Sequence, residues 1–337
     1  MNREERVRAV IEGGTPDRVP VSVWFHFSVY DQDPVSLAEA EADFVETYDY
    51  DFIKMMPFGD YGIQDLGAKL SIYCQPNRPV TLAAPGIRSM DDYRHMEVIS
   101  GLQGTYGKQV EFARHLARCV PPHTPFIQTI FSPLTTLHKL TGGRVLRDLR
   151  EDPDAVHHAL AVVTAITVDF IRYNIDAGVS GFFFATQDAR RPLLSLEEFR
   201  TFGEFYDRQV MEAYMGRTWF NVIHIHGMDV YFEEILRRYP PAVLNWHDRD
   251  TRPSLAEARA LTDRPFLAGL QAAKKIADGR EVWDDIVKNG TPESITAQVR
   301  DAIRAAGGKG IMIGPGCVVN QECPAANLRA VRQAVEI

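Results

Sequence analysis

Cysteine is scarce in this sequence. Four of the 337 residues are cysteines, at positions 74, 119, 317 and 323. The first six residues, Met1–Arg6, are mostly charged, and no apolar segment of the kind found in an export signal follows them. Without an export signal, so few cysteines are more typical of free thiols or metal ligands than of a disulfide framework. We therefore expect a protein of the reducing cytoplasm.

Long apolar runs and an excess of basic residues are absent as well. No stretch approaches the roughly 18 consecutive apolar residues of a membrane-spanning helix. The 37 Lys and Arg residues are outnumbered by 45 Asp and Glu residues, which gives a net charge of −8. Binding to nucleic acid or to an anionic membrane usually requires a basic surplus, so we expect neither partner. The composition, 45% hydrophobic and 24% charged, is that of an ordinary globular protein, and we expect a small-molecule substrate.

Short β-rich apolar runs alternate with longer helical patterns along nearly the whole chain. Such alternation favours a parallel sheet, because each return to a parallel strand needs a crossover. Eight units predict a (β/α)8 barrel, an α/β fold of the TIM-barrel type, in one domain over residues 1–337. An open, doubly wound sheet is the alternative, but no glycine-rich dinucleotide fingerprint follows the first run. The predicted strands are Val19–Phe27, Phe52–Met56, Phe126–Ile130, Gly181–Thr186, Phe220–His226, Val243–His247, Phe266–Leu270 and Gly310–Gly314.

Helical patterns fill the segments between these strands. In the last of them, Thr291 has the character of an N-cap and Pro292 that of the first helical residue. We expect an extra helix, Arg3–Gly14, to cover the bottom of the barrel, and residues 61–104 to form an insertion that contributes a lid or an edge hairpin. The predicted helices are Ser36–Tyr48, Tyr106–Cys119, Asp152–Ala177, Ser195–Met215, Val230–Tyr239, Ser254–Leu261 and Thr291–Ala306.

The fifth predicted strand ends in two histidines separated by one residue. Side chains alternate along a strand, so His224 and His226 point to the same side, into the catalytic end of the barrel. Two imidazoles so placed are suited to share a metal ion. The alternative is that one is a hydrogen-bonded core residue and the other lines a pocket.

Cys317 follows the eighth predicted strand and supplies a third candidate ligand. A His-x-His pair with a distant Cys leaves one coordination position open, which is typical of a catalytic zinc, although cobalt and iron accept the same donors. His247 ends the neighbouring sixth strand, where it is a candidate for a fourth ligand, for a partner of a ligand or for a catalytic residue that contacts substrate.

Further candidates lie at the expected mouth of the barrel. Asp60 follows the second strand as either a helix cap or a catalytic or substrate-anchoring carboxylate. A cluster of aromatic residues near the mouth suits an apolar or aromatic substrate: Trp24, Phe25, Phe27 and Phe182–Phe184. The predicted substrate-binding residues are Trp24, His26, Phe58, Gln187 and Asp188.

Several motifs together resemble the uroporphyrinogen decarboxylase superfamily. They are Arg6-x-x-Ala9 with Asp17-Arg18-Val19-Pro20, Asp188 with Leu194-Ser195, the His-x-His-Gly, and Gly314-x-Gly316-Cys317 with Pro324-x-x-Asn327. The resemblance covers nearly the whole chain and is strongest in its C-terminal half. It implies a (β/α)8 barrel.

The site residues distinguish the two branches of that superfamily. The true decarboxylases hold the substrate carboxylates with arginines after the first strand, whereas Trp24–Val29 contains no arginine. Only Asp60 fits their pattern. The cobamide-dependent methyltransferases carry His-x-Cys-Gly and a later Cys that bind zinc, and here His224 and Cys317 match while His226 replaces the first Cys. Two imidazoles and one thiolate leave a divalent metal at +1, which favours polarising an oxygen substrate over activating a thiol.

The resemblance therefore implies a zinc-dependent methyltransferase or demethylase. Its methyl group would move between a small, methoxylated or aromatic substrate and a corrinoid (cobalamin) carried by a separate protein, and relatives often form homodimers. The alternatives are a metal-free decarboxylase that uses Asp60 and a barrel that binds a ligand without turnover.

Overall fold

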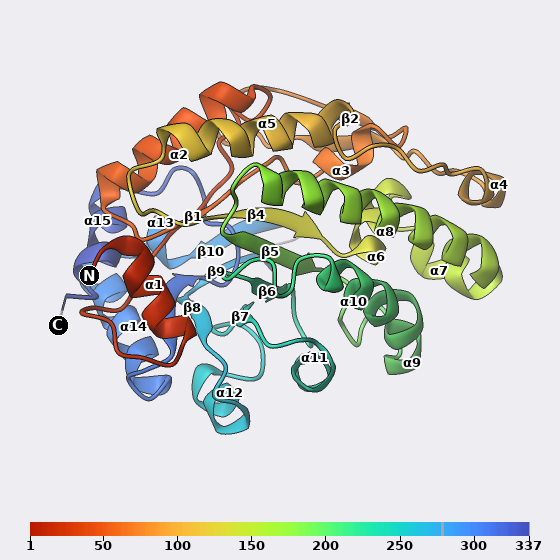
Figure 1. The fold of residues 1–337 in the computed structure, drawn as a ribbon. Helices are drawn as coiled ribbons and strands as arrows, with labels where there is room; N and C mark the ends of the chain where they lie inside the picture. The colour runs from red at the N-terminus through yellow and green to blue at the C-terminus, as the bar shows by residue number, and fades with distance from the viewer. Residues whose placement is uncertain (278–279, 337) are drawn as a thin grey trace.

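The computed structural model describes residues 1–277 and 280–336, and a curved parallel sheet lies at its centre (Figure 1). All of its strand pairs are parallel, as the alternating pattern requires. The strands, in their order across the sheet, are β1 (Ile53–Lys54), β4 (Phe126–Phe131), β5 (Gly181–Thr186), β6 (Val222–Ile225), β7 (Val243–Trp246), β8 (Phe266–Leu270) and β11 (Ile311–Pro315).

The first predicted strand, Val19–Phe27, closes this sheet but is much shorter than expected. Val21 forms a single parallel bridge with Ile313 of β11. On its other side, the backbone N–H of Asp51, just before β1, donates to the carbonyl of Val21 over 2.9 Å. Pro20 has no N–H to extend the ladder. The segment therefore sits between β11 and β1, and the predicted TIM-barrel-like fold is confirmed.

Helices cover the outside of the sheet, and most begin within two residues of the predicted positions. One of these segments, Ser195–Met215, begins where expected but is divided by a π-helical stretch, η1 (Phe199–Glu204). The α-helices are α1 (Arg3–Ile11), α2 (Pro34–Tyr48), α3 (Tyr61–Gln64), α4 (Met90–Arg94), α5 (Gly104–Cys119), α6 (Pro133–Leu140), α7 (Val145–Glu151), α8 (Pro153–Asp176), α9 (Leu196–Glu198), α10 (Phe205–Glu212), α11 (Phe232–Arg238), α12 (Leu255–Leu261), α13 (Ile286–Asn289), α14 (Pro292–Ala305) and α15 (Ala325–Gln333).

Two antiparallel hairpins are added to the barrel. The predicted insertion after β1 contains the first, β2 (Lys69–Ser71) with β3 (Thr81–Ala84). The second, β9 (Ala272–Ala277) with β10 (Arg280–Asp285), follows β8 and was not predicted from the sequence.

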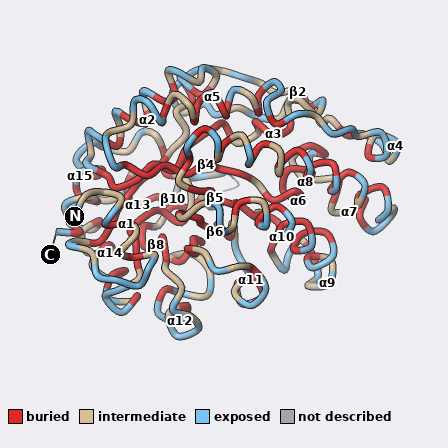
Figure 2. The backbone as a smooth tube through the Cα atoms, viewed as in Figure 1, coloured by how far each residue is buried: buried red, intermediate tan, exposed pale blue. Residues whose placement is uncertain are grey.

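The strands of the central sheet are almost entirely buried, while the outer faces of the helices are exposed (Figure 2). One hydrophobic cluster packs between sheet and helices and includes Phe182 and Phe184. The other fills the barrel interior and includes Phe183, as the alternation along β5 requires. Val7 and Val10 of α1 belong to this inner cluster, so α1 covers the barrel bottom as predicted.

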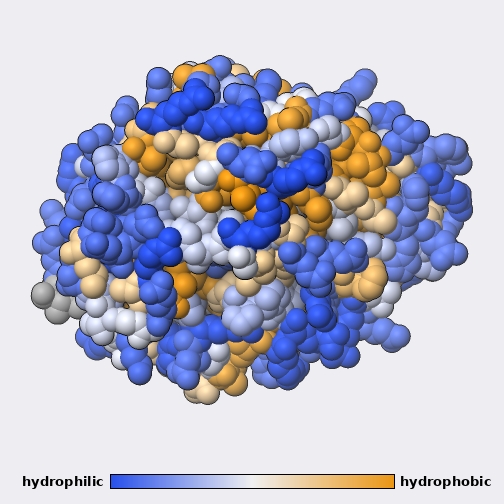
Figure 3. Space-filling model, in the orientation of Figure 1, coloured by the Kyte–Doolittle hydropathy of each residue, from blue (hydrophilic) through white to orange (hydrophobic). Residues whose placement is uncertain are grey.

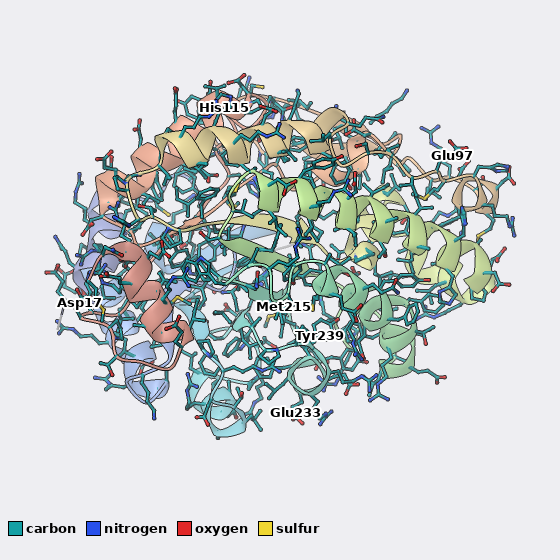
Figure 4. All side chains as sticks on the ribbon, viewed as in Figure 1. Asp17, Glu97, His115, Met215, Glu233 and Tyr239 are labelled. Atoms are coloured by element: carbon teal, nitrogen blue, oxygen red, sulfur yellow. The ribbon has the colours of Figure 1, made fainter. Side chains whose placement is uncertain are left out.

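Polar contacts fix the elements that frame the barrel. Arg6 of α1 donates to Asp17 over 2.6 Å and to the buried Asp51 over 2.7 Å, and Asp17 is labelled beside α1 in Figure 4. Tyr239, also labelled there, follows α11, and its hydroxyl donates to Asp207 of α10 over 2.6 Å. These contacts tie the N-terminal helix and α11 to the rest of the fold.

Helix α8 is long and apolar enough to meet the length-and-composition criterion for a membrane span, contrary to the expectation that no stretch approaches it. Most of it is buried, and it packs against α4, α6, α7 and α10. This burial identifies it as a core helix of the fold. The face drawn in Figure 3 is largely hydrophilic, with hydrophobic side chains in separated patches.

Candidate metal centre

Three histidines and one cysteine meet at the C-terminal ends of neighbouring strands. His224 lies on β6 and His226 directly follows it. His247 directly follows β7, whose Trp246 pairs with Ile225, so His226 and His247 come side by side. Cys317 lies two residues after β11. One donor atom from each of the four lies within 4.8 Å of the other three.

His226 Nδ1 is the common point of this cluster. It lies 3.4 Å from Nε2 of His224, 3.3 Å from Nε2 of His247 and 3.6 Å from Sγ of Cys317. A single ring nitrogen has either one proton or one lone pair, so it cannot form three hydrogen bonds. A shared metal ion accounts for the convergence better than a hydrogen-bond network does.

These three distances match three of the six edges of a zinc tetrahedron. With metal–nitrogen bonds of about 2.05 Å and metal–sulfur bonds of about 2.3 Å, tetrahedral geometry separates two nitrogens by about 3.4 Å and a nitrogen from a sulfur by about 3.6 Å. The three distances from His226 Nδ1 agree with these values. Imidazole and thiolate are also the donors that zinc prefers, so the residues present fit the ion.

The three imidazoles are held in the neutral form that binds metals. Burial, followed by the neighbouring histidines, lowers the pKa of His224 well below its usual value. Burial lowers the pKa of His226 to about 3 and that of His247 to about 4. None of these rings therefore needs to lose a proton at neutral pH before it binds a cation.

Asn245 fixes the orientation of His224. Its amide nitrogen donates to the carbonyls of Leu267, over 2.6 Å, and Pro315, over 3.1 Å. Its oxygen is thereby left to accept from His224 Nδ1, 2.5 Å away. A protonated Nδ1 leaves the lone pair on Nε2, which faces the cluster. This is the arrangement usually found behind metal-binding histidines.

Two glycines permit the close approach of the loops. A Cβ on Gly316 would lie 2.9 Å from the carbonyl oxygen of Trp246 and 3.0 Å from Cα of His247, so only glycine lets Cys317 come so near. Gly227 has a φ of +94°, and a Cβ there would lie 2.8 Å from Nε of Arg190.

The cluster opens into a cavity of about 490 Å³ at the mouth of the barrel. This volume is in the range of small-molecule sites. Besides the four cluster residues, three of the predicted substrate-binding residues line the cavity: Trp24, His26 and Gln187. The structure thus brings these seven predicted residues together.

Three other predicted site residues lie outside the lining of this cavity. Phe58 is buried in the core against Tyr61. Asp188 is buried, accepts from Thr135 Oγ1 over 2.8 Å and pairs with His138. Asp60 precedes α3 without capping it and lies 3.5 Å from Nζ of Lys139.

The aromatic wall of the cavity differs from the predicted cluster. Trp24 and Phe183 line it with their rings 5.8 Å apart, and Phe131, not predicted, joins them. Phe25 and Phe27 pack instead against Phe44, outside the cavity.

Three cationic residues of the cavity wall were missed from the sequence: Lys54, Lys139 and Arg190. A signal was present for Lys54, because a charged residue inside the apolar run Phe52–Met56 is unusual for a buried strand. Arg190 follows Gln187 at a strand end, where barrel sites lie. No Asp or Glu is among the described residues that line the cavity.

The sequence matches the family model of uroporphyrinogen decarboxylase (URO-D) over residues 2–337. The chain belongs to the uroporphyrinogen decarboxylase (URO-D) family. The expected superfamily is thereby confirmed. No match was found among curated proteins.

Solved structures similar to this URO-D family member carry methyl-transfer names. A methyltransferase from Methanosarcina mazei has 16% sequence identity and a TM-score of 0.78, with 100% of this chain and 98% of that chain covered. A B12-independent methionine synthase from a Shewanella species, in complex with selenomethionine, has 12% identity and a TM-score of 0.56, with 94% and 90% covered. A putative vitamin-B12-independent methionine synthase from Listeria monocytogenes has 12% identity and a TM-score of 0.54, with 95% of each chain covered. At these identities the likeness establishes the fold.

Proposed function

We propose that this URO-D family member is a metal-dependent methyltransferase that acts on a small methylated substrate. The observation that carries the proposal is the convergence of donor atoms of His224, His226, His247 and Cys317 within 4.8 Å of one another beside the cavity. The methyltransferase name of a similar structure supports it. Zinc is the proposed ion because the donors are imidazole and thiolate.

The ion would supply Lewis acidity to a substrate heteroatom, which would take the place of one of the four donors or add as a fifth ligand, because four protein donors fill a tetrahedral site. Three neutral imidazoles and one thiolate around a divalent ion leave a net charge of +1, which favours an oxygen atom such as that of a methoxy group over a thiol. Asn245 keeps His224 aligned, and Gly316 lets Cys317 reach the cluster. Trp24, Phe131 and Phe183 exclude water from one side of the substrate.

We further propose that the methyl acceptor or donor is a corrinoid bound to a separate protein in the cytoplasm. This rests on the likeness of the His-x-His-Gly and Cys317 motifs to those of cobamide-dependent methyltransferases. The methionine synthases with similar folds are named as B12-independent. The experiment must therefore distinguish methyl transfer to or from a corrinoid from methyl transfer without one.

Decarboxylation of a tetrapyrrole is less well supported. Such a substrate carries eight carboxylates and needs many cationic partners. The described cavity wall has three cationic residues, and Asp60 lies outside it beside Lys139.

Two measurements test the proposal. Elemental analysis of the purified protein is expected to give about one zinc per chain. The loaded protein is then mixed with cob(I)alamin and a methoxylated aromatic compound, and growth of the methylcobalamin absorbance band is followed. No metal after zinc addition overturns the metal-dependent function. Demethylation without the methylcobalamin band overturns the corrinoid part alone.

A further inference from the structure

The cavity has a second set of unusual groups, three basic side chains beside the metal centre. Lys54 comes from β1, Lys139 from α6 and Arg190 from the segment after β5. No carboxylate belongs to the described residues that line the same cavity. Asp60 lies 3.5 Å from Lys139 and Glu41 lies near Lys54, but both carboxylates are outside the lining, so the three basic side chains make this part of the cavity attractive to an anion.

Arg190 lacks protein partners for its guanidinium. Among the described residues it donates to none from its side chain and forms no ion pair, and its Nε is buried without a hydrogen-bond partner. Gly227 leaves the space in which this side chain lies, because a Cβ there would be 2.8 Å from Nε of Arg190. The side chain as a whole is partly exposed, and Nε is its buried donor. A buried donor normally has an acceptor, and a ligand in the cavity would supply one.

Lys54 is the more deeply buried cation, with 6% of its surface exposed. Its ammonium group contacts the sulfur of Met56 at 2.8 Å and lies 4.6 Å from the ring of Phe183. A thioether is a weak acceptor. Burial lowers the pKa of Lys54 to about 7, and the nearby Glu41 opposes this shift without forming an ion pair. One oxygen of Glu41 instead accepts from the backbone N–H of Met56 over 2.7 Å.

Lys139 provides the contrast. Its ammonium donates to the carbonyl of Gly59 over 2.6 Å and lies 3.5 Å from Asp60. It also lies 4.0 Å from the ring of Phe131. Because Lys139 already has oxygen partners, Arg190 and Lys54 are the two cations that a ligand would satisfy.

We propose that the substrate of this cavity carries an oxyanion group, with Arg190 as its main hydrogen-bond donor and Lys54 as a second attracting charge. Carboxylate, sulfonate and phosphate share the required chemistry, and a guanidinium binds all three through paired donors. The aromatic wall of Trp24, Phe131 and Phe183 accommodates an apolar body. This inference deepens the proposed function and rests on it for one point, that the bound molecule is the methylated substrate; a methoxylated aromatic acid combines all these features.

Calorimetric titration of the metal-free protein tests the anion site separately from the metal. The probes are benzoate, benzenesulfonate and phenyl phosphate, with benzamide as the neutral analogue of benzoate. We expect at least one oxyanion to bind about tenfold or more tightly than benzamide, because a hydrogen bond to a charged group is the stronger one. If no oxyanion probe exceeds benzamide, the inference is wrong.

Variants identify the residues responsible. Arg190→Gln is expected to weaken the best oxyanion by about tenfold or more and Lys54→Met by a smaller factor, while neither changes benzamide binding. Arg191→Gln is the matched control, since Arg191 is exposed and pairs with Asp229. Circular dichroism establishes that each variant is folded. Equal oxyanion affinity in wild type, Arg190→Gln and Lys54→Met overturns the assignment.

The two proposals fail in different ways. Zinc binding with no preference for oxyanions refutes the anion site and leaves the metal-dependent function intact. Oxyanion binding that depends on Arg190, in a protein that never takes up zinc, refutes the metal-dependent function and leaves the anion site. Oxyanion binding that appears only after zinc is added, and is insensitive to Arg190→Gln, means that the metal holds the anion and overturns the inference.

Discussion

The two walls of the cavity differ in charge: one carries neutral imidazoles and a cysteine, and the other carries basic side chains. On the wall formed by β6, β7 and β11, three donors converge on His226 Nδ1, and the histidines are neutral because burial lowers their pKa values. On the wall formed by β1, α6 and β5, the cations Lys54, Lys139 and Arg190 do not converge on a common partner. A neutral cluster can accept a metal ion, whereas cations repel it and attract an anion. One cavity can therefore hold a metal and an anionic substrate side by side.

The largest expected effect is the loss of zinc affinity when His226, the central residue of the cluster, is removed. His226→Ala deletes the nitrogen from which the other three donors lie 3.3–3.6 Å away. We expect zinc affinity to fall more than about a hundredfold, because loss of a ligand exceeds the 10–100-fold typical of its supporting residues. Competition with a chromogenic chelator measures it. His95→Ala, at an exposed position, is the control and should keep full affinity. Unchanged zinc affinity in His226→Ala would mean that the cluster is not a metal centre.

Removal of Asn245, which orients His224 without belonging to the cluster, should have a smaller effect on zinc affinity. Asn245→Leu removes the acceptor from His224 Nδ1, and zinc affinity should fall about 10–100-fold. Asn327→Leu is a matched control, since Asn327 is also buried and donates to two carbonyls, but on α15. The comparison by chelator competition fails if both variants weaken zinc equally, because a general loss of stability would then explain the effect.

Beside the other wall, the buried Glu41 is expected to make the stability of the fold depend on pH. Burial raises its pKa from 4.5 to about 8, so between these values the folded protein holds this proton more tightly than the unfolded chain. Its contribution to stability is complete below pH 4.5 and is lost as pH rises towards 8, by at most about 1.4 kcal/mol per pH unit.

Lys54 acts in the opposite direction at higher pH, because burial lowers its pKa to about 7 and the unfolded chain then binds the extra proton. The Glu41 effect is therefore clearest between pH 5 and 7. The cluster histidines, whose pKa values burial lowers, make stability rise with pH up to about 6.5, opposite to Glu41. The test is therefore the difference between variant and wild type. Urea unfolding should show Glu41→Gln gaining stability relative to wild type as pH rises from 5 to 7, by up to about 1.4 kcal/mol per pH unit, and Glu12→Gln, at an exposed position, should not. Identical slopes for Glu41→Gln and wild type would contradict this prediction.

The smallest expected effects distinguish Trp24, an aromatic residue of the cavity wall, from Phe58, an aromatic residue of the core. Phe58→Leu should cost about 1 kcal/mol of unfolding free energy without changing the affinity for benzoate, because Phe58 packs against Tyr61 outside the cavity. Trp24→Leu should weaken benzoate, because Trp24 lines the cavity. Urea unfolding and calorimetry measure the two effects. A reversed pattern would place the substrate outside the cavity wall described above.

Much of the fold could be predicted from local patterns. Apolar runs such as Gly181–Thr186 became strands, and capping residues such as Thr291 marked helix starts. The first predicted strand was overestimated because a single bridge, Val21 with Ile313, suffices to close the barrel. The hairpin β9–β10 was missed because antiparallel pairing after β8 departs from the alternating pattern.

The sequence by itself determined the alternation of strands and helices, and with it that His224 and His226 share a face at the end of one strand. That information is local, because backbone periodicity fixes where neighbouring side chains point. Only the tertiary structure decided that His247 and Cys317 join them, that Phe58 and Asp188 turn away from the cavity, and that Lys54 and Arg190 face it. Those outcomes depend on strand register, helix packing and loop approach between segments far apart in the chain, which no local pattern encodes.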